Sequence, residues 1–121
     1  MITEDYVSYE VAKLLKEKGF DEKTLSYYED NVLCHGDWFE WNRSPLGHIA
    51  APTLQLAMKW LREEKRISII IEFDLTKRGY CPYVHQLDYD MDWVVKWRVN
   101  TPMKYEKAVE VALKYSLENL I

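Results

Sequence analysis

The sequence contains two pairs of residues of the types that bind zinc, Cys34 with His35 and Cys81 with His85. Their spacing argues against a shared metal ion. Pro82 disfavours a helix around Cys81, and four residues of extended strand would hold Cys81 and His85 about 13 Å apart. Zinc ligands converge to about 2.0–2.3 Å from the metal. The sequence therefore predicts no metal site and no cofactor, with two unmodified thiols.

Three acidic residues, Asp88, Asp90 and Asp92, resemble the opening of a calcium-binding loop. Such a loop needs glycine at its sixth position for a sharp turn and a bidentate glutamate at its twelfth. This chain has Trp93 and Val99 there. The segment is therefore expected to be a hairpin turn with solvated carboxylates.

A possible acid–base group consists of His35 with Asp37 and Glu40, close in sequence to Trp38. These residues would suit a small hydrolase or a nucleotide-processing enzyme. General acid–base catalysis requires groups within about 3 Å of one substrate atom, and closeness in sequence does not establish that. The chain has no glycine-rich phosphate loop, no G-x-S-x-G and no H-E-x-x-H motif. An enzyme is therefore the alternative, and a non-enzymatic interaction protein is the leading hypothesis.

Aromatic residues are the unusual feature of the composition, at 14% with nine Tyr and five Trp. Exposed Trp and Tyr side chains dominate the energetics of many interfaces. Strand alternation puts Trp38 on one side with Glu40, and Phe39 on the other with Trp41, so that one side faces the core. The aromatic segment predicts a surface for a protein partner or for homo-oligomerisation, with a small-ligand or carbohydrate site as an alternative. The candidate binding residues are Tyr27, Tyr28, Trp38 and Trp41.

The elements that position these residues begin with an amphipathic helix from Ser8, its N-cap, to about Lys18. Gly19 then supplies the left-handed residue that ends a helix. Residues 25–41 favour strands but are interrupted by polar turn residues, which predicts one irregular hairpin. Pro and Gly in residues 42–48 are typical of a surface loop.

The stretch from Ala51 to Leu75 is expected to organise the core. Thr53 caps a helix whose apolar residues recur at helical spacing, and from Ile67 the period changes to that of a strand. Ile67, Ile69, Ile71, Phe73 and Leu75 are expected to share the interior face. Strands over residues 80–89 and 93–99 follow, and a helix over residues 104–119 ends the chain.

The sequence thus predicts an α+β fold in the order α-ββ-α-βββ-α. Its antiparallel sheet consists of a three-strand meander plus a weaker N-terminal hairpin, accompanied by three helices. A length of 121 residues predicts a single domain covering residues 1–121.

The formal net charge is −4, with a sequence pI near 5.4, which argues against general nucleic-acid binding. No apolar run suits a membrane span, and the N-terminus does not resemble a signal peptide, so a cytoplasmic location is expected. Reduced thiols follow from that location, with a Cys34–Cys81 disulfide as the alternative.

Three helical segments carry a resemblance: SYEVAKLLKEKGF, APTLQLAMKWLREE and EKAVEVALKYSLENLI. They resemble a family of short uncharacterised proteins from gut-bacterial phages and mobile elements. The resemblance implies an accessory role in a phage or mobile-element setting. The family has no established activity, so no catalytic or binding residue follows from it.

Overall fold

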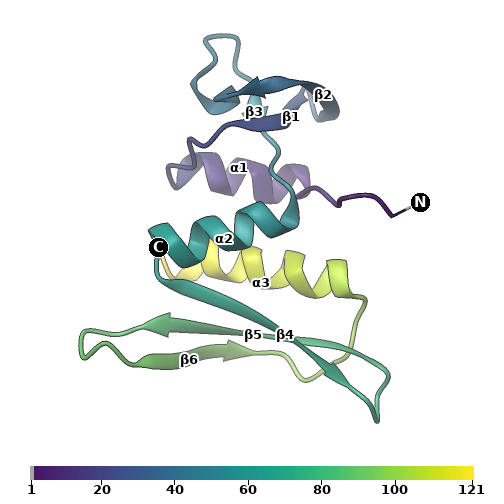
Figure 1. The fold of residues 1–121 in the computed structure, drawn as a ribbon, viewed down its shortest axis with the longest axis vertical. Helices are drawn as coiled ribbons and strands as arrows, with labels where there is room; N and C mark the ends of the chain where they lie inside the picture. Colours follow the sequence, from purple (N-terminus) through teal and green to yellow (C-terminus); the bar gives the residue numbers. More distant parts are fainter. Residues whose placement is uncertain (1) are drawn as a thin grey trace. The chain divides into compact units, whose positions relative to one another are not determined.

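Three α-helices and two three-stranded antiparallel sheets build the computed structural model, which describes residues 2–121 (Figure 1). The predicted α+β class and the order α-ββ-α-βββ-α are confirmed, with a 3-10 turn and a two-residue strand in addition. The elements are α1 (Tyr9–Glu17), β1 (Thr24–Glu29), β2 (Val32–Phe39), η1 (Trp41–Arg43), β3 (Ile49–Ala50), α2 (Leu54–Glu64), β4 (Ile67–Asp74), β5 (Gly79–Leu87), β6 (Trp93–Arg98) and α3 (Tyr105–Asn119).

Backbone contacts divide the chain into an N-terminal unit, Met1–Ala57, and a C-terminal unit, Met58–Ile121. The division falls inside α2. The single domain expected from the chain length stays a prediction.

Helix α1 of the N-terminal unit has the ends that its sequence predicts. The Ser8 side chain accepts a hydrogen bond from the Val11 backbone N–H at 3.2 Å, which satisfies an unpaired donor of the first turn. At the other end Gly19 has φ +96°, and the Phe20 N–H donates to the Leu15 carbonyl at 2.9 Å. This is the Schellman arrangement, and it buries the Phe20 ring in the core.

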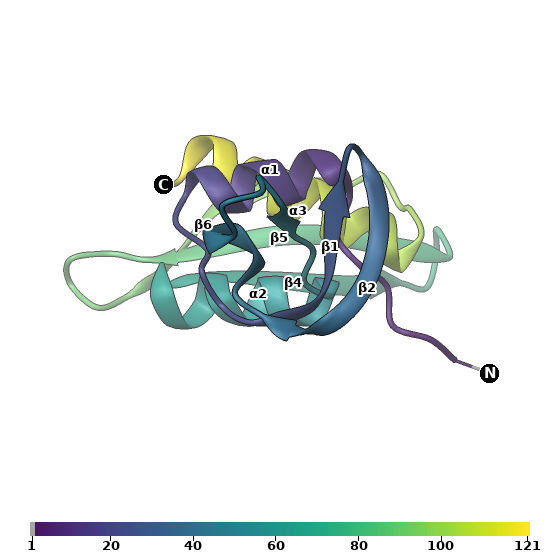
Figure 2. The same cartoon turned by 90° about the horizontal axis from the view of Figure 1, so that it is seen from above.

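The sheet of the N-terminal unit has the order β2-β1-β3. Asp30 and Asn31 join β1 to β2, and both have positive φ, as a tight two-residue hairpin turn requires. Figure 2 shows β1 and β2 as two curved strands. The short strand β3 follows the loop expected at residues 42–48 and was not predicted. Asn42 anchors that loop, because its side chain donates to the Phe20 carbonyl and accepts from the Ala50 N–H.

The sheet of the C-terminal unit is the predicted meander, β4-β5-β6. Helix α3 contacts β4 and β5, and buries an apolar strip that includes Val109, Leu113 and Leu117. The facing sheet residues include Ile69 and Val84, which are paired across the two strands. Helix and sheet therefore bury one face of the meander and leave the opposite face open.

The interior face of β4 is shorter than its alternating pattern predicts. Ile67 and Ile69 are buried, but Phe73 is exposed and Leu75, beyond the end of β4, is 82% exposed. Phe73 lies against Tyr80, and Tyr80 packs on Tyr105, the first residue of α3. The first residue of α3 therefore lies near this end of β4, and α3 does not cover Phe73 or Leu75.

Candidate functional site

A groove of about 790 Å³ opens on the N-terminal unit beside Trp38, and we call it the Trp38 groove. Its apolar lining includes Tyr6, Leu25, Trp38, Pro52 and Leu56, and its polar lining includes Glu4, Glu22, Lys23, Glu40 and Gln55. Trp38 itself is 66% exposed. An exposed indole over an apolar floor is a typical anchor for a bound molecule.

An irregularity in the hairpin lies beside Trp38, on a strand that is exposed along nearly its whole length. Ser26 is paired with His35, and Thr24 with Phe39. Between these two pairs β2 has three residues and β1 has one. The additional residues of β2 form a bulge at Gly36–Trp38, and bulges re-aim the side chains that they carry. Gly36 leaves room for the two aromatic rings there, because a Cβ atom would lie 3.2 Å from both the Tyr27 and the Trp41 rings.

Backbone hydrogen bonds hold the opposite wall of the groove. The Val7 N–H donates to the Pro52 carbonyl at 3.0 Å, and the Leu54 N–H donates to the Asp5 carbonyl at 2.9 Å. The Thr53 hydroxyl accepts from the Leu56 N–H at 3.1 Å, and so caps α2 as predicted. The wall is therefore fixed before anything binds, which lowers the entropic cost of binding.

Carboxylates outnumber ammonium groups along the groove, with Glu4, Glu22 and Glu40 against Lys23. Arg43 offsets part of this charge, because its guanidinium lies 3.2 Å from the Glu40 carboxylate and 2.6 Å from that of Asp21. The hydrogen bond to Asp21, together with the charges of Glu40 and Asp21, raises the pKa of Arg43 above its ordinary value. The groove therefore favours a cationic or neutral ligand.

Of the four aromatic residues proposed from the sequence, Trp38 alone lines the groove. Tyr28 is buried and donates from its hydroxyl to the Val7 carbonyl at 2.7 Å. Tyr27 stacks on Trp41 with ring centroids 4.0 Å apart, and the Trp41 indole N–H donates to the Thr24 carbonyl. These three side chains support the hairpin that carries Trp38.

Two members of the possible acid–base group, His35 and Glu40, are engaged in structural contacts, and the third, Asp37, is exposed. His35 is exposed, but its ring nitrogen Nδ1 is hydrogen-bonded to the hydroxyl of the buried Ser26. The Glu40 carboxylate is engaged by Arg43. A hydrolase would need these groups to converge on one exposed atom.

A second serine–histidine contact was missed by sequence reasoning. The Ser44 hydroxyl lies 2.8 Å from His48 Nδ1, and His48 Nε2 lies 4.0 Å from a Glu29 carboxylate oxygen. His48 is buried beside the stacked rings of Tyr27 and Trp41, and its ring lies nearly perpendicular to both. This contact fixes the loop before β3.

The rest of the groove also escaped sequence reasoning. Glu4, Glu22 and Leu56 come from three separate segments, and no spacing in the sequence links them. The one available signal was the alternation that placed Trp38 and Glu40 on the same side, and both line the groove.

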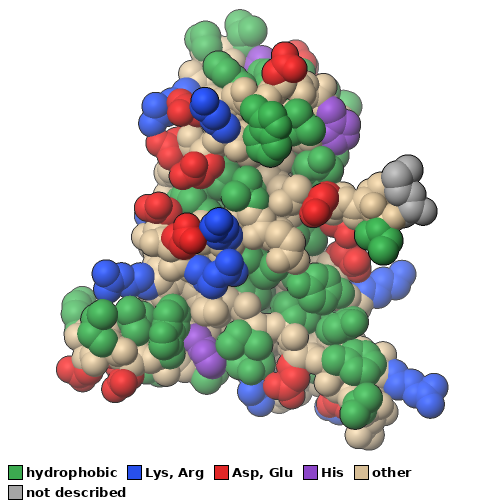
Figure 3. Space-filling view, in the orientation of Figure 1, with side chains coloured by type: hydrophobic (Ala, Val, Ile, Leu, Met, Phe, Trp, Pro, Cys, Tyr) green, Lys and Arg blue, Asp and Glu red, His purple; other side chains and the backbone are tan. Residues whose placement is uncertain are grey.

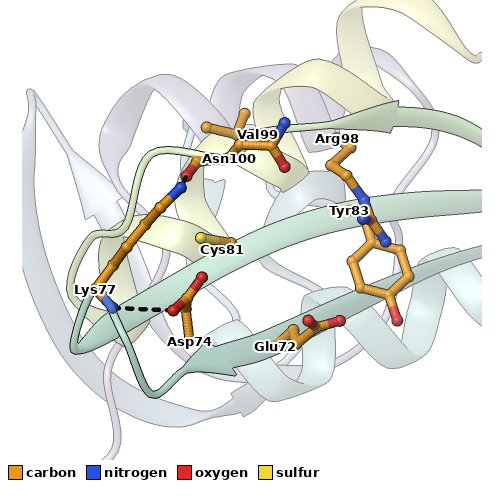
Figure 4. A pocket seen from close by; sticks show the side chains of 8 residues that line it. All are labelled: Glu72, Asp74, Lys77, Cys81, Tyr83, Arg98, Val99 and Asn100. Carbon is orange, nitrogen blue, oxygen red and sulfur yellow. Dashed lines mark hydrogen bonds between the residues drawn. The ribbon is translucent and has the colours of Figure 1, made fainter.

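The C-terminal unit has a smaller hollow, of about 150 Å³, on the open face of its sheet (Figure 4). Lys77 Nζ donates to the Asn100 carbonyl at 3.0 Å, and the Lys77 backbone N–H donates to the Asp74 carboxylate at 2.9 Å. The Arg98 guanidinium lies 4.6 Å from the centroid of the Tyr83 ring. Cationic and anionic groups are balanced here, so the hollow favours no class of ligand.

Within residues 2–121, no group of three or more His, Cys, Asp or Glu side chains is placed to hold a metal ion. Cys34 and Cys81 are both free thiols, so the alternative of a disulfide between them is not realised. None of the helices in this described part of the chain is long and apolar enough to cross a membrane.

Comparison of the chain with models of protein families, with curated proteins and with solved structures gave no match. The resemblance to phage and mobile-element proteins therefore stays a prediction.

Proposed function

We propose that this protein is a non-enzymatic interaction protein that binds a segment of a protein partner in the Trp38 groove. The observation that carries the proposal is the exposed Trp38 indole beside an apolar floor on a fixed wall. A cytoplasmic location and an accessory role in a phage or mobile-element setting belong to the same proposal.

The lining of the groove defines the chemistry of the partner. Tyr6, Leu25 and Leu56 suit one large apolar side chain, which the Trp38 ring would cover. The carboxylates of Glu4 and Glu22 favour lysine or arginine next to that side chain, and the net charge of −4 adds a weak general attraction. The expected partner segment is therefore a large apolar residue flanked by basic residues.

The test uses fluorescently labelled peptides that carry one Trp, Phe or Leu flanked either by lysines or by glutamates. Fluorescence anisotropy would measure their binding to the full chain. We expect the basic peptides to bind more tightly, and Trp38→Ala to weaken them about tenfold or more, as loss of a central aromatic anchor does. Tyr89→Ala is the matched control, because it removes a fully exposed ring outside the groove.

Equal affinity of the basic and acidic peptides, or equal losses for Trp38→Ala and Tyr89→Ala, would refute the proposal. Circular dichroism of each variant would show that the fold is retained.

A small molecule or carbohydrate is the second candidate ligand. The volume of about 790 Å³ lies in the range of about 300–1,000 Å³ that is usual for small-ligand pockets. Saturation-transfer NMR with a panel of mono- and disaccharides would test this candidate. A signal that Trp38→Ala abolishes, without any peptide binding, would favour it over the protein partner.

A further inference from the structure

The last strand of the C-terminal sheet has a free edge. Among the strands that the structure describes, β6 pairs with β5 alone. Three consecutive apolar residues of β6 are exposed: Trp93 by 49%, Val94 by 39% and Val95 by 51%. Figure 3 shows hydrophobic side chains gathered at the end of the sheet where β5 turns into β6. An apolar edge strand with unpaired backbone groups is a site for adding another strand.

The hydrogen bonds of the β5–β6 pair show which residues face this edge. The Asp88 N–H donates to the Asp92 carbonyl at 2.8 Å, so the backbone polar groups of Asp92 point towards the β5 side. Backbone groups of an antiparallel strand alternate in direction along the chain. The N–H and C=O groups of Trp93 and Val95 therefore point away from β5.

One antiparallel register of β6 with a second copy of itself satisfies these groups. When Val94 faces Val94 of the copy across a two-fold axis, Trp93 faces Val95 of the copy. Both of those residues have outward-pointing backbone groups, so they can exchange a pair of hydrogen bonds. Trp93 is paired with Leu87, and Val95 with His85, two residues on the same face of β5, so their side chains also share a face. The apolar residues of the two copies then cover one another.

The charges at the two ends of this segment complement one another in the same register. Asp92 precedes the apolar residues and Lys96 follows them. Antiparallel pairing about Val94 places Asp92 opposite Lys96 of the copy, and the two-fold axis repeats the pair. Registers centred further along the strand are disfavoured, because they would place the irregularity at Lys96, which has no partner on β5, inside the paired segment. The register about Val94 leaves Lys96 at the end of that segment.

We infer that a second copy of this chain pairs with β6, joining two three-stranded sheets into a continuous six-stranded sheet. The contact lies within the C-terminal unit and does not rest on the function proposed for the Trp38 groove. The paired segment is short, so the dimer is weak, and it forms as the protein concentration rises.

Sedimentation velocity of the full chain, over a series of concentrations up to about 1 mM, measures this association, because short interfaces give weak complexes. We expect a concentration-dependent dimer. Val94→Lys should abolish it by placing two like charges face to face on the axis. Val32→Lys is the matched control, because it makes the same substitution at an exposed valine of the N-terminal unit and should leave the dimer unchanged.

Charge reversal tests the register. Asp92→Lys and Lys96→Asp should each raise the dissociation constant about fivefold or more, because each places two like-charged pairs at the interface. The double reversal should restore the dimer towards the wild-type value. The two single changes move the net charge of −4 in opposite directions, so a general charge effect cannot weaken both.

A monomer at every concentration would overturn the inference. So would a double reversal that is no better than either single change, or a loss of the dimer in Val32→Lys as large as that in Val94→Lys. Far-ultraviolet circular dichroism of each variant separates loss of pairing from loss of fold.

Discussion

The rings of Tyr27 and Trp41 stack with their centroids 4.0 Å apart and their planes inclined by 26°. The two residues come from β1 and from the η1 turn after β2, and Gly36 of β2 lies directly against both rings. The stack therefore fixes the η1 turn after β2 against the middle of β1, in the hairpin that presents Trp38.

Gly36→Ala tests how closely this stack is packed. A Cβ atom there would lie 3.2 Å from a carbon of each ring. The Trp41 ring has little room to move, because its N–H is bonded to the Thr24 carbonyl and His48 meets it edge-on. We expect a loss of about 1–3 kcal/mol in the free energy of unfolding, as overpacking causes.

Urea denaturation followed by tryptophan fluorescence measures this loss. Asp37→Ala, at the exposed neighbouring position, is the control, and its effect should stay within about 0.5 kcal/mol. Equal stability of Gly36→Ala and the wild-type chain would show that the rings shift to make room.

Arg43→Gln tests the charge of the Trp38 groove. The change removes the guanidinium that lies 3.2 Å from the Glu40 carboxylate, and so leaves the groove more negative. We expect basic peptides to bind about twofold to threefold more tightly at low salt, since exposed charge pairs have modest effects.

The raised pKa of Arg43 adds a condition to this experiment. A cation with a raised folded-state pKa stays protonated until the pH rises through that value, so Arg43 remains charged across the ordinary working range. The effect of Arg43→Gln should therefore be the same at neutral and mildly alkaline pH, and should shrink as salt is added. Unchanged or weaker binding at low salt would show that Glu40 does not act on the ligand.

Leu117→Ala tests the packing of α3. Leu117 is fully buried in the described chain and lies near the end of that helix. We expect the variant to lose about 2–5 kcal/mol, because truncating a buried leucine leaves a cavity. Glu118→Ala, one residue further along and exposed, is the matched control for thermal unfolding. A similar melting temperature for the two variants would contradict the packing described for α3.

The helices and the meander could be predicted because their signals are local. Ser8 and Gly19 mark the ends of α1, and the change of period near Ile67 marks the start of β4. The exposure of Phe73 could not be predicted, because it depends on where Tyr105 begins a helix far along the chain.

The candidate site was predictable only in part. Strand alternation correctly placed Trp38 and Glu40 on the same side. It could not predict that Tyr28 is buried with its hydroxyl bonded to the carbonyl of Val7, which lies many residues earlier. The groove itself exists because the chain before α1 is bonded to the start of α2. Such long-range pairings leave no periodic pattern in a sequence.

The bulge at Gly36–Trp38 places Trp38 on residues that take no part in the strand pairing of the hairpin. Its additional residues belong to β2 alone, while the hairpin pairs on both sides of it, Ser26 with His35 and Thr24 with Phe39, stay in place. Substitutions at Asp37 and Trp38 would alter the lining proposed to bind a partner and should leave these strand pairs intact. The surface proposed for binding can therefore change in sequence without a change in the pairing of the hairpin that carries it.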